Sequence, residues 1–167
     1  SGKRMTWHVS CTFSSDEGAM TAEEESSFET AYYNREDWKG RFIGETKDYE
    51  YHLYRKKFGC KKAVKLAKLY VCGMGAFECW INGERVSDHV MEPGWTDFRK
   101  TCFYTAYDVT EYFAEGENIE NIILVKLGDC MFNVPGGRYV YFQRSYGKAK
   151  LLCQLELVYE DGSREYV

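Results

Sequence analysis

The sequence predicts an all-β protein, a jelly-roll β-sandwich with one short helical turn. Aromatic residues make up 17% of the chain, with 14 Tyr and 10 Phe, and these residue types favour strands. Extended runs recur between turn signals at regular spacing, as in sandwiches. The length of 167 residues is enough for one sandwich with a core and too short for two full domains.

In the first half of the chain, the tract from Ser14 to Ser27 is rich in Ser and Glu and predicts an exposed loop. Residues 49–58 alternate as a strand, which Gly59 ends. A further strand is predicted over 64–72, with alternate side chains on opposite faces.

The clearest local signal is the pair Asn82-Gly83, because both residues accept the positive φ of a type I′ turn and extended runs flank them. The segment Pro93-Gly94-Trp95 then predicts a stiff corner. After an extended run over 101–107, residues 108–113 predict a single capped helical turn.

Two strands are predicted in the last third. Residues 119–127 are too apolar for a half-solvated strand, so they are assigned to the centre of the sandwich. Residues 151–159 alternate with one apolar face, and Asp161-Gly162 turns the chain into a final strand.

Charge and cysteine usage restrict the function classes. The formal net charge is −4, with 22 basic and 26 acidic residues interleaved, which disfavours nucleic-acid binding. No segment has the apolar length of a membrane span. The seven cysteines are unpatterned and lie mostly in apolar runs, which favours reduced thiols and a cytoplasmic location over a disulfide framework; secretion is left open.

Five motifs stand out together: the Ile81-Asn82-Gly83 hairpin, the corner Pro93-Gly-Trp-Thr-Asp-Phe98, Tyr104-Thr-Ala-Tyr-Asp-Val-Thr110, Leu127-Gly128-Asp129 and Asn133-Val-Pro-Gly-Gly-Arg138. Taken together, they resemble the N-terminal, carbohydrate-binding-module-like β-sandwich domain of bacterial α-L-rhamnosidases. The resemblance covers residues 32–167 and implies a jelly-roll domain there. Residues 1–31 are expected to begin with a tag remnant. The rest of this segment resembles the end of a preceding fibronectin-like domain, with an N-terminal extension as the alternative.

Glycoside hydrolysis needs two carboxylates placed across the scissile bond. The rhamnosidase family carries them on a separate helical barrel, which is absent from these residues. The resemblance therefore implies that this chain alone is not an enzyme, but a fragment of a glycoside hydrolase with the catalytic domain of the same parent as a partner.

Sugar binding needs an aromatic face and a few fixed polar groups. Some family modules of this type bind L-rhamnose through calcium, so the resemblance implies an L-rhamnose-containing glycan as ligand, with calcium as a candidate cofactor held by oxygen ligands and no cofactor as the alternative. The candidate binding residues are Trp95, Asp97, Asp129, Asn133 and Arg138, with Asp129 and Asn133 as candidate calcium ligands.

Structural roles compete with each of these assignments. Trp95 after Pro-Gly is more often a plug at the end of a sandwich than a stacking platform. Asp97, like Asp108, is also typical of a turn cap, and Asp129 after Gly128 is typical of a turn at the end of a strand. Two functions therefore remain open: an accessory domain that recognises substrate, and a structural interdomain module that orients the catalytic domain without binding sugar.

Overall fold

A computed structural model describes residues 2–45, 51–113, 119–136 and 143–167. The chain divides into two compact units, Ser1–Lys39 and Gly40–Val167. Each unit is described by itself.

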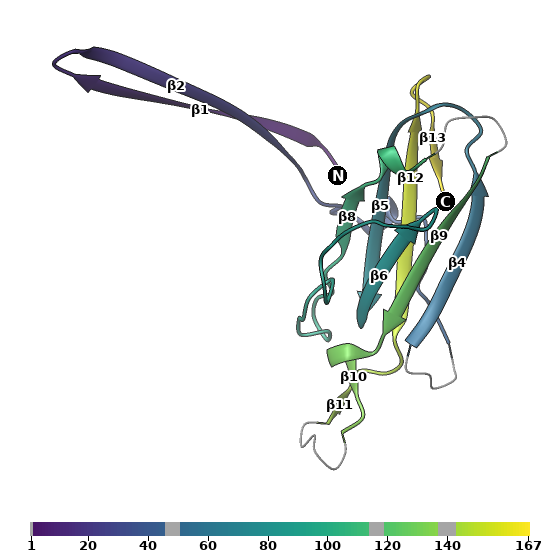
Figure 1. Ribbon diagram of the computed structural model, residues 1–167. Coiled ribbons are helices and arrows are strands. Elements are labelled where there is room, and N and C mark those ends of the chain that lie inside the picture. Colours follow the sequence, from purple (N-terminus) through teal and green to yellow (C-terminus); the bar gives the residue numbers. More distant parts are fainter. Residues whose placement is uncertain (1, 46–50, 114–118, 137–142) are drawn as a thin grey trace. The chain divides into compact units, whose positions relative to one another are not determined.

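The first unit is a long antiparallel hairpin of β1 (Arg4–Ser15) and β2 (Gly18–Glu29), followed by the short 3-10 helix η1 (Arg35–Asp37) (Figure 1). The loop predicted from Ser14 to Ser27 is wrong, because most of this tract belongs to β2. Composition misled here: Glu23, Glu25 and Ser27 of this tract lie on the polar face of a strand whose backbone hydrogen bonds come from β1.

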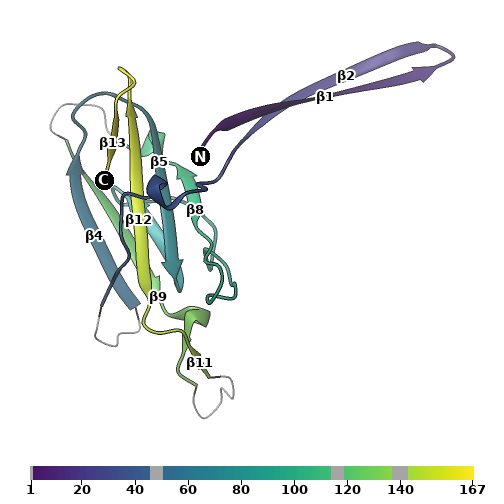
Figure 2. The same ribbon diagram turned by 180° about the vertical axis from the view of Figure 1, so that it is seen from behind.

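The second unit contains two large antiparallel sheets and a small two-stranded one, and the two large sheets confirm the all-β sandwich. One sheet has the order β13-β12-β5-β8, with β3 also paired to β12, and the other has the order β4-β9-β6-β7 (Figures 1 and 2). The strands are β3 (Ile43–Gly44), β4 (Tyr51–Gly59), β5 (Val64–Met74), β6 (Ala76–Ile81), β7 (Glu84–Arg85), β8 (Thr105–Asp108), β9 (Glu120–Gly128), β12 (Lys150–Tyr159) and β13 (Arg164–Tyr166).

The core lies between the two sheets. Alternate residues of β5, β6, β9 and β12 point into it, because side chains on a strand alternate between faces. The strand predicted to be central is central: β9 pairs with β4 on one side and β6 on the other. The fully buried side chains include Leu69, Val71, Phe77, Ile81, Val125, Leu127, Leu155 and Leu157.

The predicted hairpin at Asn82-Gly83 is also confirmed. Asn82 has φ 52° and Gly83 φ 91°, and Ile81 pairs with Glu84 across the turn. The Asn82 side chain ties the turn to the neighbouring segments: its amide donates to Asn121 Oδ1 (2.8 Å) and to the Tyr112 carbonyl (2.9 Å).

One helical turn was predicted, and the described residues contain three short 3-10 turns. The predicted one is η2 (Thr110–Tyr112), where Asp108 Oδ1 accepts the Thr110 backbone N–H (3.1 Å). The others are η1 and η3 (Cys130–Phe132), each three residues long and too short to leave a periodic signal in the sequence. Among the described residues, no helix has the length and apolarity to span a membrane.

The chain crosses from one sheet to the other at Gly75, the single residue between β5 and β6. A Cβ at Gly75 would lie 2.1 Å from the Gly128 carbonyl oxygen, so only glycine allows this close crossing. Beyond Gly128 the chain forms η3 and the small ladder of β10 (Asn133–Val134) and β11 (Arg144–Ser145), which lies at the end of the sandwich where β9 ends (Figure 1).

Candidate functional site at one end of the sandwich

The corner loop, residues 87–104, is anchored to the sandwich at Glu92. Its carbonyl accepts the Phe77 N–H of β6 (2.9 Å), and its carboxylate accepts the Tyr107 hydroxyl of β8 and lies 3.1 Å from His89 Nδ1. Burial raises the pKa of Tyr107, and the bond to Glu92 raises it further, so the hydroxyl remains a donor. This attachment fixes the loop to both sheets, because β6 and β8 belong to different ones.

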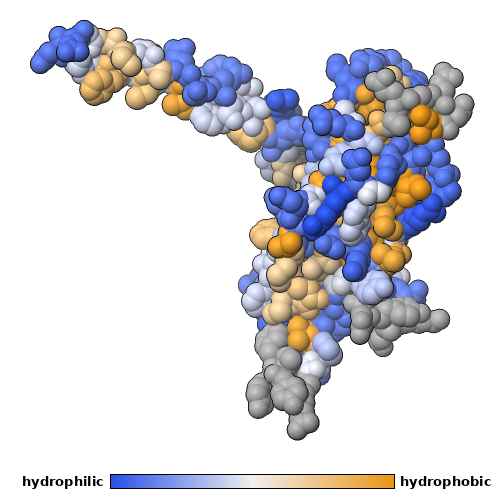
Figure 3. Space-filling model, viewed as in Figure 1, coloured by the Kyte–Doolittle hydropathy of each residue, from blue (hydrophilic) through white to orange (hydrophobic). Residues whose placement is uncertain are grey.

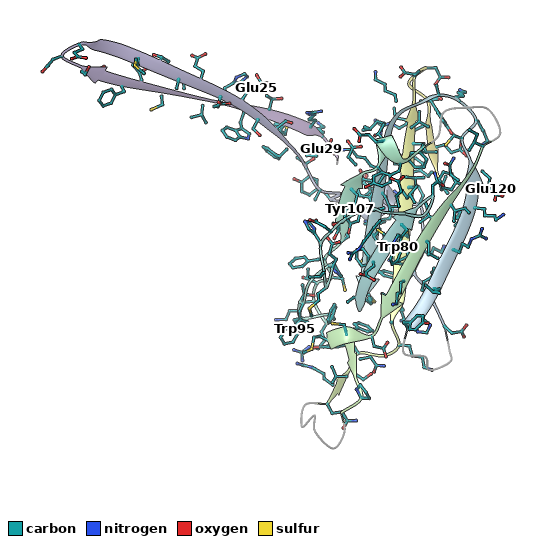
Figure 4. The ribbon with its side chains drawn as sticks, viewed as in Figure 1. Glu25, Glu29, Trp80, Trp95, Tyr107 and Glu120 are labelled. Atoms are coloured by element: carbon teal, nitrogen blue, oxygen red, sulfur yellow. The ribbon has the colours of Figure 1, made fainter. Side chains whose placement is uncertain are left out.

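Trp95 projects from this loop with 57% of its surface exposed (Figure 4). A turn places it there, in which the Gly94 N–H donates to the Met91 carbonyl (3.1 Å). The exposure contradicts the interpretation of Trp95 as a core plug. Val90, Met91 and Phe103 on the same loop are exposed as well, and no periodicity in the sequence singled them out.

Asp97 forms a two-pronged ion pair with Arg99, in which Nε and Nη2 lie 2.8 and 2.9 Å from the two carboxylate oxygens. The Arg99 backbone N–H also donates to Oδ1 (3.3 Å), so the carboxylate caps its own turn. The hydrogen bonds from Arg99 lower the pKa of Asp97. Asp97 is therefore a fixed anion whose charge is largely balanced.

Asp129 and Asn133 are brought together by η3. The Asp129 carbonyl accepts the Phe132 N–H (3.0 Å), and the Asn133 amide donates to Asp129 Oδ2 (2.7 Å). Both side chains are half-buried. The Asp97 carboxylate thus performs the turn-capping role that competed with ligand binding, whereas the Asp129 carboxylate bonds the Asn133 side chain and accepts no backbone N–H of η3.

Three aromatic rings join the corner loop to the segment after β9. Phe98, next to Asp97, packs edge-on against Phe132 (centroids 5.1 Å apart) and Tyr146 (5.4 Å), and Phe132 stacks on Tyr146 (5.7 Å). The Arg144 guanidinium lies 5.1 Å from the centre of the Tyr146 ring and contributes to the lowered pKa of Asp97.

This aromatic cluster places the Asp97 turn and the Asp129–Asn133 pair at the same end of the sandwich. Figure 3 shows hydrophobic side chains gathered over this end. Five residues of this arrangement were not predicted: Phe98, Arg99, Phe132, Arg144 and Tyr146. The only available signal was that Phe98, Arg99 and Phe132 lie within three residues of predicted site residues.

Arg138, the fifth predicted residue, lies outside the described residues. Within the part of the chain that the structure describes, no group of three or more His, Cys, Asp and Glu side chains could hold a metal ion. Asp129 and Asn133 supply oxygen donors, however. With the amide of Asn133 turned over, its Oδ1 would face the Asp129 carboxylate, and the pair would then offer two of the six to eight oxygen ligands that calcium takes.

The arrangement is suited to binding. It offers one exposed indole face, a charge-balanced Asp97–Arg99 pair two to four residues further along the same loop, and a second loop held in place by packed rings. These are the components of a shallow polar site with an aromatic platform.

Comparison with known proteins agrees with this fold. The family described as "Alpha-L-rhamnosidase N-terminal domain" matches residues 62–167. The chain is 30% identical to an α-L-rhamnosidase of Formosa agariphila, over 98% of this chain and 19% of that protein.

Solved structures give the same result. The chain superposes with a TM-score of 0.86 on an α-L-rhamnosidase from Aspergillus terreus at 27% identity, covering all of this chain and 20% of that one. For the enzyme from Dictyoglumus thermophilum the TM-score is 0.74 at 33% identity, over 99% of this chain and 19% of that one. The chain thus spans about a fifth of the length of these relatives, and it belongs to the N-terminal domain family of α-L-rhamnosidases.

Proposed function

We propose that the chain is a non-catalytic accessory domain of a longer α-L-rhamnosidase-like glycoside hydrolase and that it recognises an L-rhamnose-containing glycan. The observation that carries this proposal is the exposed Trp95 beside the Asp97–Arg99 pair, on a loop locked to the segment after β9. The names of its relatives support the substrate class. Catalysis is assigned to the remainder of the longer polypeptide.

Each component has a role in sugar recognition. The indole face of Trp95 would stack on the apolar face of a pyranose ring. Asp97 and Arg99 would accept and donate hydrogen bonds to neighbouring hydroxyls. Asp129 and Asn133 would hold calcium, which when bound would attract vicinal hydroxyl oxygens.

An NMR titration with L-rhamnose, with and without calcium, tests this function. We expect a dissociation constant of roughly millimolar to high micromolar, because the site is shallow. Trp95→Ala should weaken binding at least about tenfold through loss of the stacking surface. Leu53→Ala is the matched control, because Leu53 is equally exposed but lies on β4. Absence of shifts at tens of millimolar sugar, with or without calcium, contradicts the proposal.

One observation favours the alternative, a structural interdomain module. Val90, Met91 and Phe103 are exposed around Trp95, and apolar residues gathered on one loop are typical of a docking surface. Quenching of Trp95 fluorescence by acrylamide in the natural full-length polypeptide separates the two functions. An accessible Trp95 supports sugar recognition, whereas a shielded Trp95 supports docking of this loop on another domain.

A further inference from the structure

The outer face of the β4-β9-β6-β7 sheet combines aromatic, aliphatic and basic side chains. Alternate residues of β6 and β9 point into the core, so the residues between them, and those paired with these on β4 and β7, point outward. Figure 3 shows hydrophobic and hydrophilic side chains interleaved over β4 and β9. The outward side chains include the aromatic Tyr51 and Trp80, the aliphatic Ile122 and Leu124, the basic Arg55, Lys57, Arg85 and Lys126, and the acidic Glu78 and Glu120.

This outer face is basic, although the whole chain is acidic. Its four basic and two acidic side chains give a net charge of +2, against −4 for the chain. Both acidic side chains are used by basic neighbours. Glu120 Oε1 lies 2.5 Å from Lys57 Nζ, and Glu78 Oε1 lies 2.7 Å from Arg85 Nη2.

Arg55 and Lys126 are the basic side chains of the outer face that form no ion pair with another of the described residues. Both are exposed. Lys126 Nζ lies 4.8 Å from the centre of the Tyr51 ring. Arg55 is paired with Leu124, which is paired in turn with Trp80. Two cations beside aromatic rings are therefore available to a ligand.

The register places the aromatic rings and a cation on one diagonal of the sheet. Tyr51 is on β4, Lys126 is one strand across and two residues along on β9, and Trp80 is a further strand across and two residues along on β6 (Figure 4). Strands lie about 4.8 Å apart and alternate residues about 6.8 Å apart, so Tyr51 and Trp80 are separated by about 17 Å. Several linked sugar rings span such a distance.

Only side chains can recognise a ligand at the centre of this face. The backbone of β9 is bonded to β4 on one side and β6 on the other, so a peptide cannot join the sheet there. A second copy is a poor partner, because a two-fold contact would bring two basic faces together. An acidic glycan fits, because aromatic rings stack on the apolar faces of sugars and Arg55 can hold a carboxylate or sulfate with two parallel hydrogen bonds.

We propose that the outer face binds an acidic glycan. Trp80 and Tyr51 stack on its sugar rings, and Arg55 and Lys126 pair with its carboxylate or sulfate groups. This inference rests on the proposed glycan-recognising function, to which it adds an anionic substrate class and a second contact surface. The two surfaces can be tested separately, because the loop of Trp95 is proposed to contact a neutral sugar.

NMR titration of the 167-residue chain with tetragalacturonate tests the proposal, with the uncharged methyl ester of the same sugar as control. We expect amide shifts on β4, β6 and β9, with a dissociation constant of roughly 0.1 to several millimolar and at least about tenfold weaker binding of the ester. Raising the salt concentration from about 0.1 to about 1 M should weaken binding, because salt screens the ion pairs. A carrageenan tetrasaccharide, which carries sulfate without carboxylate, identifies the preferred anion.

Variants on one strand separate specific pairing from general attraction. Arg55→Gln should weaken binding about three- to fivefold. Lys56→Gln is the matched control, because it removes the same charge from an exposed neighbour that is paired with the core residue Ile123 and so lies on the opposite side of the sheet. Trp80→Ala should weaken binding about tenfold, and Tyr51→Ser, at a half-exposed position, tests stacking if the Trp80 variant fails to fold.

Four results would overturn the proposal. They are the absence of shifts on the outer face at tens of millimolar of both acidic sugars, equal losses for Arg55→Gln and Lys56→Gln, tighter binding of hexaglutamate with the same dependence on Arg55, and a concentration-dependent dimer that Arg55→Gln abolishes. The third would assign the face to an acidic protein segment and the fourth to a second copy. Trp95→Ala should leave tetragalacturonate binding unchanged, so failure of L-rhamnose binding alone refutes the Trp95 site and not the outer face.

Discussion

Among the polar residues of the sandwich, Asn82 is the one whose substitution we expect to lower the free energy of unfolding most. Replacing it by Gly and by Ala separates the contribution of its side-chain hydrogen bonds from that of its backbone conformation. The side chain donates to Asn121 Oδ1 and to the Tyr112 carbonyl, and its Oδ1 accepts the Ile122 N–H (2.9 Å). Asn121 is fully buried, so it would lose a partner that water could not replace. Asn82 also has φ 52°, which Gly adopts freely and Ala does not.

The magnitudes follow from these contacts. Three hydrogen bonds at about 1 kcal/mol each predict that Asn82→Gly lowers the free energy of unfolding by about 2 to 3 kcal/mol. Asn82→Ala adds about 1 kcal/mol for the left-handed backbone, net of the greater flexibility of Gly in the unfolded chain. Glu84→Ala, two residues further along, should change stability by less than about 0.5 kcal/mol.

Urea unfolding followed by circular dichroism measures these differences, provided that the slope of the transition is unchanged. A loss below about 1 kcal/mol for Asn82→Gly would refute the importance of the hydrogen bonds. Equal losses for Gly and Ala would refute the backbone contribution.

Three further predictions concern other parts of the structure. Arg99→Ala should raise the pKa of Asp97 towards its usual value near 3.9, and an NMR pH titration of the Asp97 carboxyl carbon measures this change. Because the pKa of Asp97 is lower in the folded than in the unfolded protein, the ion pair stabilises the fold at pH values above the unfolded pKa. This contribution is lost as the pH falls through the folded pKa. Gly75→Ala should cost more than about 3 kcal/mol or prevent folding, whereas Gly162→Ala, with positive φ but open space, should cost about 1 kcal/mol in urea unfolding. The exposed thiols of Cys11 and Cys130 should react rapidly with Ellman's reagent at pH 8, and fast reaction of more than these two in native protein would contradict the structure. Burial raises the pKa to about 12 for the thiols of Cys72, Cys79 and Cys153.

The sequence predicted the sandwich well because its signals there are local. Alternation located β4, β5 and β12, and the Asn82-Gly83 pair located a hairpin whose residues have the required positive φ. The same reasoning failed for β2, because polar residues on a solvated strand have the composition of a loop.

The candidate site was predicted only in part, because its residues are brought together by contacts between segments that are far apart in the sequence. Asp97, Asp129 and Asn133 could be selected by residue type and turn context. Their assembly depends on Phe98 packing against Phe132 and Tyr146, and no local pattern encodes that contact. The exposure of Trp95 could not be predicted either, because a Pro-Gly-Trp sequence is compatible with an indole that is buried in the sandwich or exposed to solvent.

The crossing at Gly75 has a mechanical consequence. Its backbone connects both sheets through one residue, and both loops of the candidate site are attached close to it: Asp129 follows Gly128, and Glu92 of the corner loop accepts the Phe77 N–H. Sliding of one sheet over the other is most restricted at this shared corner. The loops therefore attach to the stiffest end of the sandwich, where a ligand meets a preorganised surface and little entropy is lost on binding.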